Sequence, residues 1–351
     1  MKSFLKTLLF PFAILYDAVT KIRNFLFDKG IFKVYEPPVF SIGVGNLSVG
    51  GTGKTPFISY LIKTFPDKKI AILSRGYGRK TKGYIEVNQE ATTDTVGDEI
   101  LMLYQRHEST AKFFVSENRK LGIENILLKY PETDLILFDD IYQHRKVKPA
   151  FLVLLSTFDK PFFKDFLLPM GRLREARSGA KRADAVIITK AQSLHEERLV
   201  TTFLKQVKKY GQSENSLFFN KQVFAKLKND FGKALETDEN VKLISGIANN
   251  HSFEVEVTKY QKVIEKHFYP DHHSYTRKNL DDAFKLMPNA PLVTTEKDYV
   301  KLKYLLTEKE KEQVYVLKLE SAFIKREDEF LRNIKTSFKS FQEQKGSLNN
   351  G

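Results

Sequence analysis

The chain has 351 residues, of which 42% are hydrophobic and 13% aromatic, which predicts a globular protein long enough for two domains. It contains no cysteine, which excludes disulfides and thiolate metal sites. Lysine and arginine (57) outnumber aspartate and glutamate (43), and the formal net charge of +14 favours acidic partners: phosphorylated metabolites, anionic lipid or nucleic acid.

Residues 1–30 predict an amphipathic helix associated with a membrane surface. The uninterrupted apolar stretch, Leu8 to Tyr16, is shorter than the roughly 20 residues of a spanning helix, and no small-residue cleavage pattern follows it. Apolar residues instead recur at helical spacing between flanking lysines and arginines, as in interfacial helices. The same spacing also fits a helix packed on the protein's own core, kinked at Pro11.

Residues 31–212 predict a doubly wound α/β domain with a parallel sheet, because short apolar runs alternate with helical stretches. The expected strands are PVFSIGV (38–44), KKIAILS (68–74), KFFVS (112–116), DLILFDD (134–140), AFLVLLS (150–156) and ADAVIIT (183–189).

Residues 213–351 predict a smaller α/β domain that begins after the polar stretch 208–216. VKLISGIA (241–248) and APLVTTEK (290–297) are expected strands, and LDDAFKLM (280–287) and FIKREDEFLRNIKTSF (323–338) are expected helices. Two further strand-like segments, LFFNKQVFAKL (217–227) and QVYVLKL (313–319), bracket this group and could pair as a connector.

The segment SVGGTGKT follows the first expected strand and precedes a helix, and it nearly matches the phosphate-binding loop of nucleotide-binding proteins. Glycines let consecutive backbone N–H groups point at phosphate oxygens, the lysine reaches the β and γ phosphates of ATP, and the threonine hydroxyl binds Mg²⁺. A serine replaces the first glycine of the motif. The predicted loop residues are Ser48, Val49, Gly50, Gly51, Thr52, Gly53, Lys54 and Thr55.

Asp139 and Asp140 end the expected strand DLILFDD, where the carboxyl edge of a parallel sheet places ligand-binding groups. We expect one of them to bind or orient Mg²⁺, although adjacent acids also occur in solvated loops. A GTPase is disfavoured, because Tyr142 and Gln192 occupy the positions of its switch glycine and base-reading aspartate.

Five further clusters carry polar residues, and each also has an ordinary structural explanation. SRGYGR (74–79), QHRK (143–146) and GRLREARSGAKR (171–182) are rich in arginine and lysine, which bind phosphate but also form solvated faces. In VGDE (96–99), Asp98 and Glu99 could simply cap a helix. YPDHHSYT (269–276) fits a surface loop or, with further ligands, a metal site.

Together these motifs resemble the tetraacyldisaccharide 4′-kinases of lipid A biosynthesis, in order and spacing, from about residue 36 to residue 303. The resemblance implies an ATP- and Mg²⁺-dependent lipid kinase that phosphorylates the 4′-hydroxyl of a tetraacylated glucosamine disaccharide 1-phosphate. It also implies a peripheral or monotopic position on the cytoplasmic face of the bacterial inner membrane, with no nucleic-acid partner. Arginines suit the anionic 1-phosphate of this substrate.

In this family the aspartate of the GDE motif is the catalytic base and a histidine of the DHH motif is its partner, which implies these roles for Asp98 and His272. Lys54, Asp139 and Asp140 complete the expected catalytic set, with Thr55, Asp139 and Asp140 as metal ligands. The residues expected to contact the substrate are Arg75, Glu99, Arg119, Gln143, His144 and Arg174.

Three positions depart from the family pattern: Ile141 replaces a glycine, and Ala176 and Asn250 replace prolines. A β-branched residue disfavours positive φ, so we expect the loop after Asp140 to take another shape. The alternative function is a basic P-loop ATPase acting on nucleic acid or as an assembly factor. That alternative leaves the apolar N-terminal helix and the Asp98–His272 pair without a role, and no nucleic-acid-binding module is evident.

Overall fold

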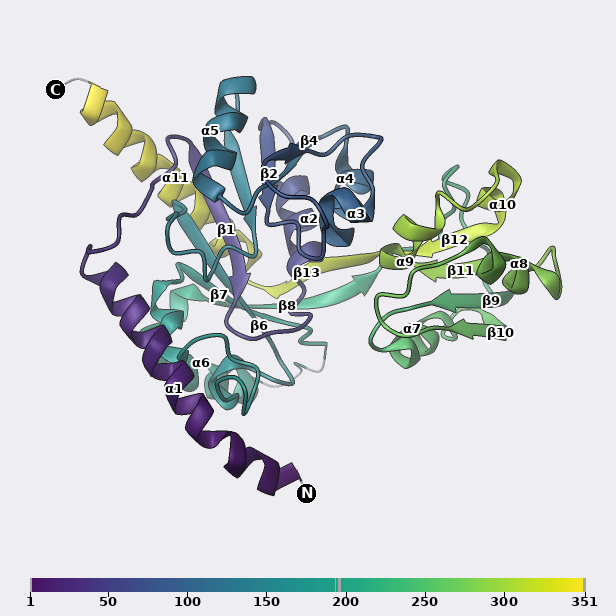
Figure 1. The fold of residues 1–351 in the computed structure, drawn as a ribbon, viewed down its shortest axis with the longest axis horizontal. Coiled ribbons are helices and arrows are strands. Elements are labelled where there is room, and N and C mark those ends of the chain that lie inside the picture. Colours follow the sequence, from purple (N-terminus) through teal and green to yellow (C-terminus); the bar gives the residue numbers. More distant parts are fainter. Residues whose placement is uncertain (1, 193, 195–196, 350–351) are drawn as a thin grey trace.

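The computed structural model describes residues 2–192, 194 and 197–349, and its largest element is a nine-stranded sheet (Figure 1). The strands from β8 to β4 run parallel, and the edge strands β13 and β3 are antiparallel to their neighbours. In spatial order they are β13 (Leu319–Lys325), β8 (Leu217–Phe224), β7 (Ala185–Thr189), β6 (Phe151–Thr157), β1 (Phe40–Asn46), β5 (Leu135–Asp139), β2 (Ile70–Ser74), β4 (Ala111–Val115) and β3 (Ile85–Glu86).

Helices cover both faces of this sheet, which is why its central strands are continuously apolar and buried. One face packs against α2 (Lys54–Thr64), α4 (Asp98–His107), preceded by the short α3 (Thr93–Val96), and α11 (Glu327–Asn349). The other face packs against α5 (Arg119–Lys129) and α6 (Glu197–Lys208). The prediction of a doubly wound α/β fold is therefore confirmed.

A smaller unit is built on a second, four-stranded parallel sheet of order β10-β9-β11-β12. Its strands are β9 (Asn240–Ser245), β10 (Lys262–Phe268), β11 (Leu292–Thr295) and β12 (Val314–Leu317), and its helices are α7 (Asn250–Val257), α8 (Arg277–Lys285), α9 (Glu296–Leu302) and α10 (Glu308–Gln313). The antiparallel pair β8–β13 links this unit to the large sheet (Figure 1).

The structure corrects three details of the predicted second group. The segment QVYVLKL pairs with LFFNKQVFAKL only at its end, where Leu319 faces Phe224 and the Ala225 N–H donates to the Lys318 carbonyl. Its residues Val314–Leu317 form β12 of the small sheet, and most of β13, the partner strand of β8, follows this segment. The first residues of the predicted helix 323–338 extend β13, where Phe323 packs on the large core. The predicted division assigns all residues from 213 to the smaller unit, whereas β8, β13 and α11 complete the large sheet and its core.

The N-terminal helix α1 (Lys2–Asp28) lies along the outside of the large unit (Figure 1). Its contacts with the rest of the chain are mostly polar: Tyr16 donates a hydrogen bond to the Arg174 carbonyl, and Asn24 donates one to Glu175. Its large apolar side chains are instead exposed: Phe10, Phe12, Ile14, Leu15, Val19, Ile22 and Phe25. Within the described part of the chain, no helix is both long and apolar enough to cross a bilayer.

Candidate active site

The loop between β1 and α2 has the geometry of a phosphate cradle. Gly50 and Gly53 adopt φ of 108° and 86°, a conformation that residues with a Cβ rarely take. Gly53 is also the N-cap of α2, so the free N–H groups of the first helical turn face the loop. Asn46 donates a hydrogen bond of 2.8 Å to the Thr52 hydroxyl, and the Thr189 hydroxyl donates one of 2.8 Å to the Thr52 carbonyl. Neighbouring strands therefore hold the loop in place.

Asp139 is the last residue of β5, the neighbour of β1, and Asp140 follows it; the two have different surroundings. Asp139 is buried, and the Ser74 hydroxyl donates a hydrogen bond of 3.1 Å to its Oδ2. Asp140 accepts two hydrogen bonds from Nη1 of Arg174 (3.2 and 3.0 Å) and lies 3.7 Å from Lys54 Nζ. Asp140 itself has a φ of 50°.

As a consequence, the pKa values of the two carboxyl groups are shifted in opposite directions. Burial raises the pKa of Asp139 to about 7, and the charge of Glu99 adds to this effect. Burial also acts to raise the pKa of Asp140, but the positive charges of Lys54 and Arg174 outweigh it and lower that pKa below its usual value. Asp140 is therefore the carboxylate that balances the local cations.

The arrangement fits a Mg²⁺ ion that binds together with a nucleotide. Oδ1 of Asp139 is buried without a hydrogen-bond partner, and Thr55 stands in the first turn of α2. Among the described residues, no group of three or more His, Cys, Asp or Glu could hold a metal alone. A carboxylate oxygen and a hydroxyl are oxygen donors of the kind that Mg²⁺ takes, with phosphate oxygens and water as its remaining ligands.

The second half of the site joins the large and small units. Asp98 is the first residue of α4, and its Oδ2 lies 3.2 Å from Nδ1 of His272, which belongs to the loop between β10 and α8. Lys297, in the first turn of α9, places its Nζ 3.3 Å from Nε2 of His272 and 3.8 Å from Oδ2 of Asp98. Because a lysine ammonium only donates, Nε2 of His272 accepts, and in a neutral imidazole the proton then lies on Nδ1, the ring nitrogen nearer to Asp98.

The other predicted substrate residues fall into two groups around the carboxylates. Gln143 donates hydrogen bonds to the Asn46 carbonyl and to Glu175, and accepts one from Arg174, so it belongs to the network around Asp140. Glu175 is fully buried and accepts two hydrogen bonds of 2.8 Å from Arg182.

The second group contains Arg75, Glu99, Arg119 and His144, and the two arginines supply its positive charge. Burial lowers the pKa of Arg119 to about 10, opposed by the nearby charge of Asp139. Burial likewise lowers the pKa of His144 to about 4, and the charges of Arg119, Lys146 and Arg75 add to this effect. Arg75 itself is exposed. Although the Glu99 side chain is also exposed, partial desolvation raises its pKa, and the Asp98 and Asp140 carboxylates contribute.

The three departures from the family pattern are accommodated locally. Positive φ falls on Asp140 and not on Ile141, which is buried against Gly43 of β1. Ala176 has φ of −56° and ψ of 147°, the backbone of a proline. Asn250 is the first residue of α7, a position that proline favours, and its amide donates a hydrogen bond to the Tyr269 carbonyl.

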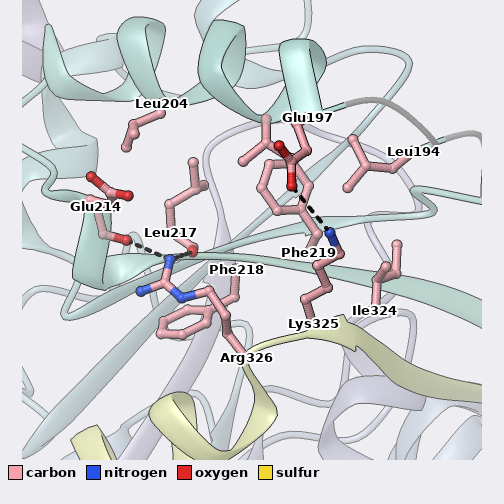
Figure 2. Close-up of a pocket in the computed structure, with 11 residues that line it drawn as sticks. Leu194, Glu197, Leu204, Glu214, Leu217, Phe218, Phe219, Ile324, Lys325 and Arg326 are labelled. Carbon is pink, nitrogen blue, oxygen red and sulfur yellow. Dashed lines mark hydrogen bonds and ion pairs between the residues drawn. The ribbon is translucent and has the colours of Figure 1, made fainter.

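The sequence analysis assigned no role to Lys297, Glu175 or Ser74. Lys297 follows a strand directly, at a helix start within VTTEKD, which is the position where ligand-binding groups of an α/β sheet are expected. Glu175 lies in the arginine-rich segment, where an isolated acid predicts an ion pair. A separate cavity of about 130 Å³ between α6, β8 and β13 (Figure 2) includes none of the predicted site residues in its lining.

Comparisons with known proteins find relatives over nearly the whole chain. Residues 5–339 match the family described as tetraacyldisaccharide-1-P 4′-kinase. The tetraacyldisaccharide 4′-kinase of Flavobacterium psychrophilum is 40% identical over 95% of this chain and 96% of its own length. That of Cytophaga hutchinsonii is 38% identical over 87% and 88%. The crystal structure of LpxK from Aquifex aeolicus in complex with ATP has a TM-score of 0.80 and 31% identity, covering 95% of this chain and 99% of that one.

Proposed function

Because the chain belongs to the tetraacyldisaccharide-1-P 4′-kinase family, we propose that it transfers the γ-phosphate of ATP to the 4′-hydroxyl of a tetraacylated glucosamine disaccharide 1-phosphate. The observation that carries this proposal is the pairing of a phosphate cradle with a carboxylate–imidazole pair at the junction of two units. The cradle suits ATP, and Asp98 with His272 suits a hydroxyl that must lose its proton.

The nucleotide phosphates bind at the loop 48–55, where Lys54 and the backbone N–H groups of α2 offset their charge. Thr55 and Asp139 would hold Mg²⁺, and the free Oδ1 of Asp139 supports this assignment. When bound, this ion compensates the charge on the β and γ phosphates. Asp140 keeps Lys54 and Arg174 oriented, in line with its two ion pairs.

The proposed base is Asp98. As the alcohol oxygen forms its bond to the γ-phosphorus, the bond from that phosphorus to the bridging β–γ oxygen breaks, and ADP leaves with the electron pair. The alcohol proton passes to the Asp98 carboxylate. His272 orients this carboxylate through Nδ1, and Lys297 occupies Nε2, which keeps the imidazole in the required tautomer.

The acceptor is expected to approach from the membrane. The exposed apolar face of α1 suits the boundary between headgroups and acyl chains, and the helix is bonded to Arg174 and Glu175 beside the paired aspartates. Arg75, Glu99, Arg119, Gln143, His144 and Arg174 are the proposed acceptor contacts. This arrangement supports a peripheral or monotopic location on the cytoplasmic face of the inner membrane, where ATP is available.

The test is a thin-layer assay with radiolabelled ATP, Mg²⁺ and tetraacyldisaccharide 1-phosphate in neutral detergent micelles. We expect the wild-type protein to form a labelled lipid with a second phosphate. Lys54→Ala and Thr55→Ala should each lower kcat on the order of 10²-fold or more, because each removes compensation of transition-state charge. Thr64→Ala, at the far end of α2, is the matched control. No labelled lipid from the folded wild type would refute the proposal.

A further inference from the structure

A pocket of about 560 Å³ lies where three segments of the large unit meet. The segments are the chain after α1, the start of α5, and the loop that follows Asp140. The residues that line it are Lys33, Val34, Tyr35, Asn118, Lys120, His144 and Lys146. Three of these are lysines and none is acidic, so the pocket suits an anionic ligand.

Two of the lysines are available to such a ligand. Within the described residues, neither Lys33 nor Lys146 forms an ion pair, whereas Lys120 lies 3.6 Å from Glu124. His144 contributes no positive charge near neutral pH, because burial and the surrounding cations lower its pKa to about 4. Its neutral imidazole can still donate or accept a hydrogen bond. The pocket therefore offers point charges and a neutral polar group to one ligand.

Positive charge continues from this pocket toward the paired aspartates. Arg119 lies between Asn118 and Lys120 in the sequence. The charges of Asp139 and Asp140 act to raise the pKa of its guanidinium, against the effect of burial. The charge of Arg75 acts on both Arg119 and His144. The Arg119 side chain is itself buried, so it favours an anionic ligand in this region through its charge and not through direct contact.

The border of the pocket is apolar on one side. Val34 lines the pocket, and the exposed Ile31 and Phe32 precede Lys33 in the chain. The Phe32 ring packs edge-on against Phe27 at the end of α1. A soluble phosphorylated metabolite has no acyl chains that could contact these apolar side chains. A phosphate on an acylated saccharide brings acyl chains with it. This combination distinguishes the pocket from a general anion site.

We propose that this pocket binds the 1-phosphate of the acceptor, the group on the sugar ring opposite the ring that carries the 4′-hydroxyl. The inference rests on the proposed function. Lys33 and Lys146 hold the phosphate while the hydroxyl lies near Asp98, so the pocket selects acceptors that already carry a phosphate at the far end. An anionic headgroup of the surrounding membrane is the competing source of the same chemistry.

The test compares two acceptors in neutral detergent micelles, the tetraacyldisaccharide with its 1-phosphate and the same lipid without it. In Lys33→Gln/Lys146→Gln, we expect the KM for the phosphorylated acceptor to rise on the order of 10-fold, while kcat/KM for the dephosphorylated acceptor and the KM for ATP stay unchanged. The control is Lys148→Gln, since Lys148 lies in the same loop but is paired with Glu36 and does not line the pocket.

Three results would overturn the proposal. One is an unchanged KM in the double variant, and another is an equal loss with both acceptors. The third is a loss that appears only when phosphatidylglycerol is added to the micelles, which would assign the lysines to membrane lipid. A folded wild type that phosphorylates neither acceptor would refute the proposed function instead. In that case, equal binding of the wild type and the double variant to micelles of the phosphorylated lipid would also overturn the pocket assignment.

Discussion

Asp139 and Asp140 show how neighbouring residues of one type acquire different properties. Their order in the sequence predicts two carboxylates at a strand end, but it cannot predict which one is buried. In the structure the alternation of strand residues turns Asp139 inward toward Ser74, while Asp140 leaves the strand with positive φ and meets Lys54 and Arg174. The free Oδ1 of Asp139 is what favours this residue as the metal ligand.

The pairing of Asp98 and His272 is a case where sequence patterns could suggest the contact only through a family resemblance. The two residues are far apart in the chain, and no local pattern reports a contact across two units. The role of Lys297 could not be predicted for the same reason, because it depends on the contact of Lys297 with Nε2 of His272. Gly53 and Lys54, in contrast, were predictable because all parts of the phosphate loop are local in sequence.

We predict that Asp98 and His272 act as one unit. Asp98→Asn should lower kcat on the order of 10²-fold to 10⁴-fold, the range for loss of a general base, with little change in the KM for ATP. His272→Gln should lower kcat as well. The double variant should lose less than the product of the two single losses, because coupled residues are not additive.

Steady-state kinetics on the three variants measure this coupling. Asp94→Asn is the control, since Asp94 is an exposed acid that pairs with Lys80 just before α4. Losses that multiply in the double variant would mean that the two residues act independently. Wild-type kcat in Asp98→Asn would return the base role to the paired aspartates.

At the scale of elements, strands were predicted best where both of their faces are buried. The continuous apolar runs of β1, β2, β5 and β7 follow from that burial. The edge strand β10 (Lys262–Phe268) alternates exposed and half-buried positions. Its charged residues give it the composition of a loop, so the sequence does not predict it as a strand. The last helix was predicted to begin at residue 323, whereas α11 begins at Glu327. Phe323 belongs to β13 but continues the apolar spacing of the helix, which explains the error.

We predict that Ala176→Pro stabilises the protein by about 0.4–1 kcal/mol, since it reduces the freedom of the unfolded chain at a position whose backbone already suits proline. Within the described residues, the Ala176 N–H donates no hydrogen bond that proline would remove. The measurement is the urea midpoint of unfolding. Asn250→Pro is the comparison, and it should gain less because it loses the side-chain bond to Tyr269. A lower midpoint in Ala176→Pro would show that the site is strained.

We predict that α1 attaches the protein to membranes through its exposed side chains. Leu15→Asp/Val19→Asp/Ile22→Asp should move the protein from the pellet to the supernatant in sedimentation with phosphatidylglycerol vesicles, because three exposed apolar side chains become charged. Circular dichroism and the thermal midpoint should be unchanged. Leu121→Asp/Leu128→Asp, which alters exposed leucines of α5, is the control. Pelleting by the folded triple variant at the wild-type level would exclude this role for the helix.

At the scale of the whole molecule, the active site depends on how the two units are held together. The chain crosses between them twice, through β8 and β13, and side chains fix their orientation. Arg106 of α4, whose side chain is 9% exposed, lies 3.3 Å from Glu296 of α9 and 2.7 Å from Glu320 of β13. Tyr304 adds a hydrogen bond to the Ala91 carbonyl. Sequence patterns cannot predict these contacts, since each partner alone resembles an ordinary surface residue.

The Arg106–Glu296 pair joins the two helices that carry site residues: α4 begins at Asp98, and Glu296 precedes Lys297 in α9. We predict that Arg106→Met lowers both stability and kcat. Stability falls because the largely buried Glu296 loses its cationic partner, and burial already raises the pKa of this carboxyl. Removing one partner of a buried ion pair costs up to about 3–5 kcal/mol. The kcat falls because His272 is no longer held against Asp98.

The double variant Arg106→Met/Glu296→Gln separates these two effects. It removes the uncompensated charge, so the urea midpoint should recover most of its loss. The kcat should stay low, because the Arg106–Glu296 ion pair between α4 and α9 is still absent. The Lys297–Asp98 contact of 3.8 Å is then the ion pair left to position Lys297 relative to α4, among the described residues. Lys325→Met/Glu197→Gln, which breaks another ion pair of β13 and leaves Arg106, Glu296 and Glu320 unchanged, is the control for loss of an ion pair of this strand. If kcat recovers together with stability, the orientation of the two units does not depend on this pair, and the contact between His272 and Asp98 must be maintained by the other connections, such as the strands β8 and β13 and the Tyr304 hydrogen bond.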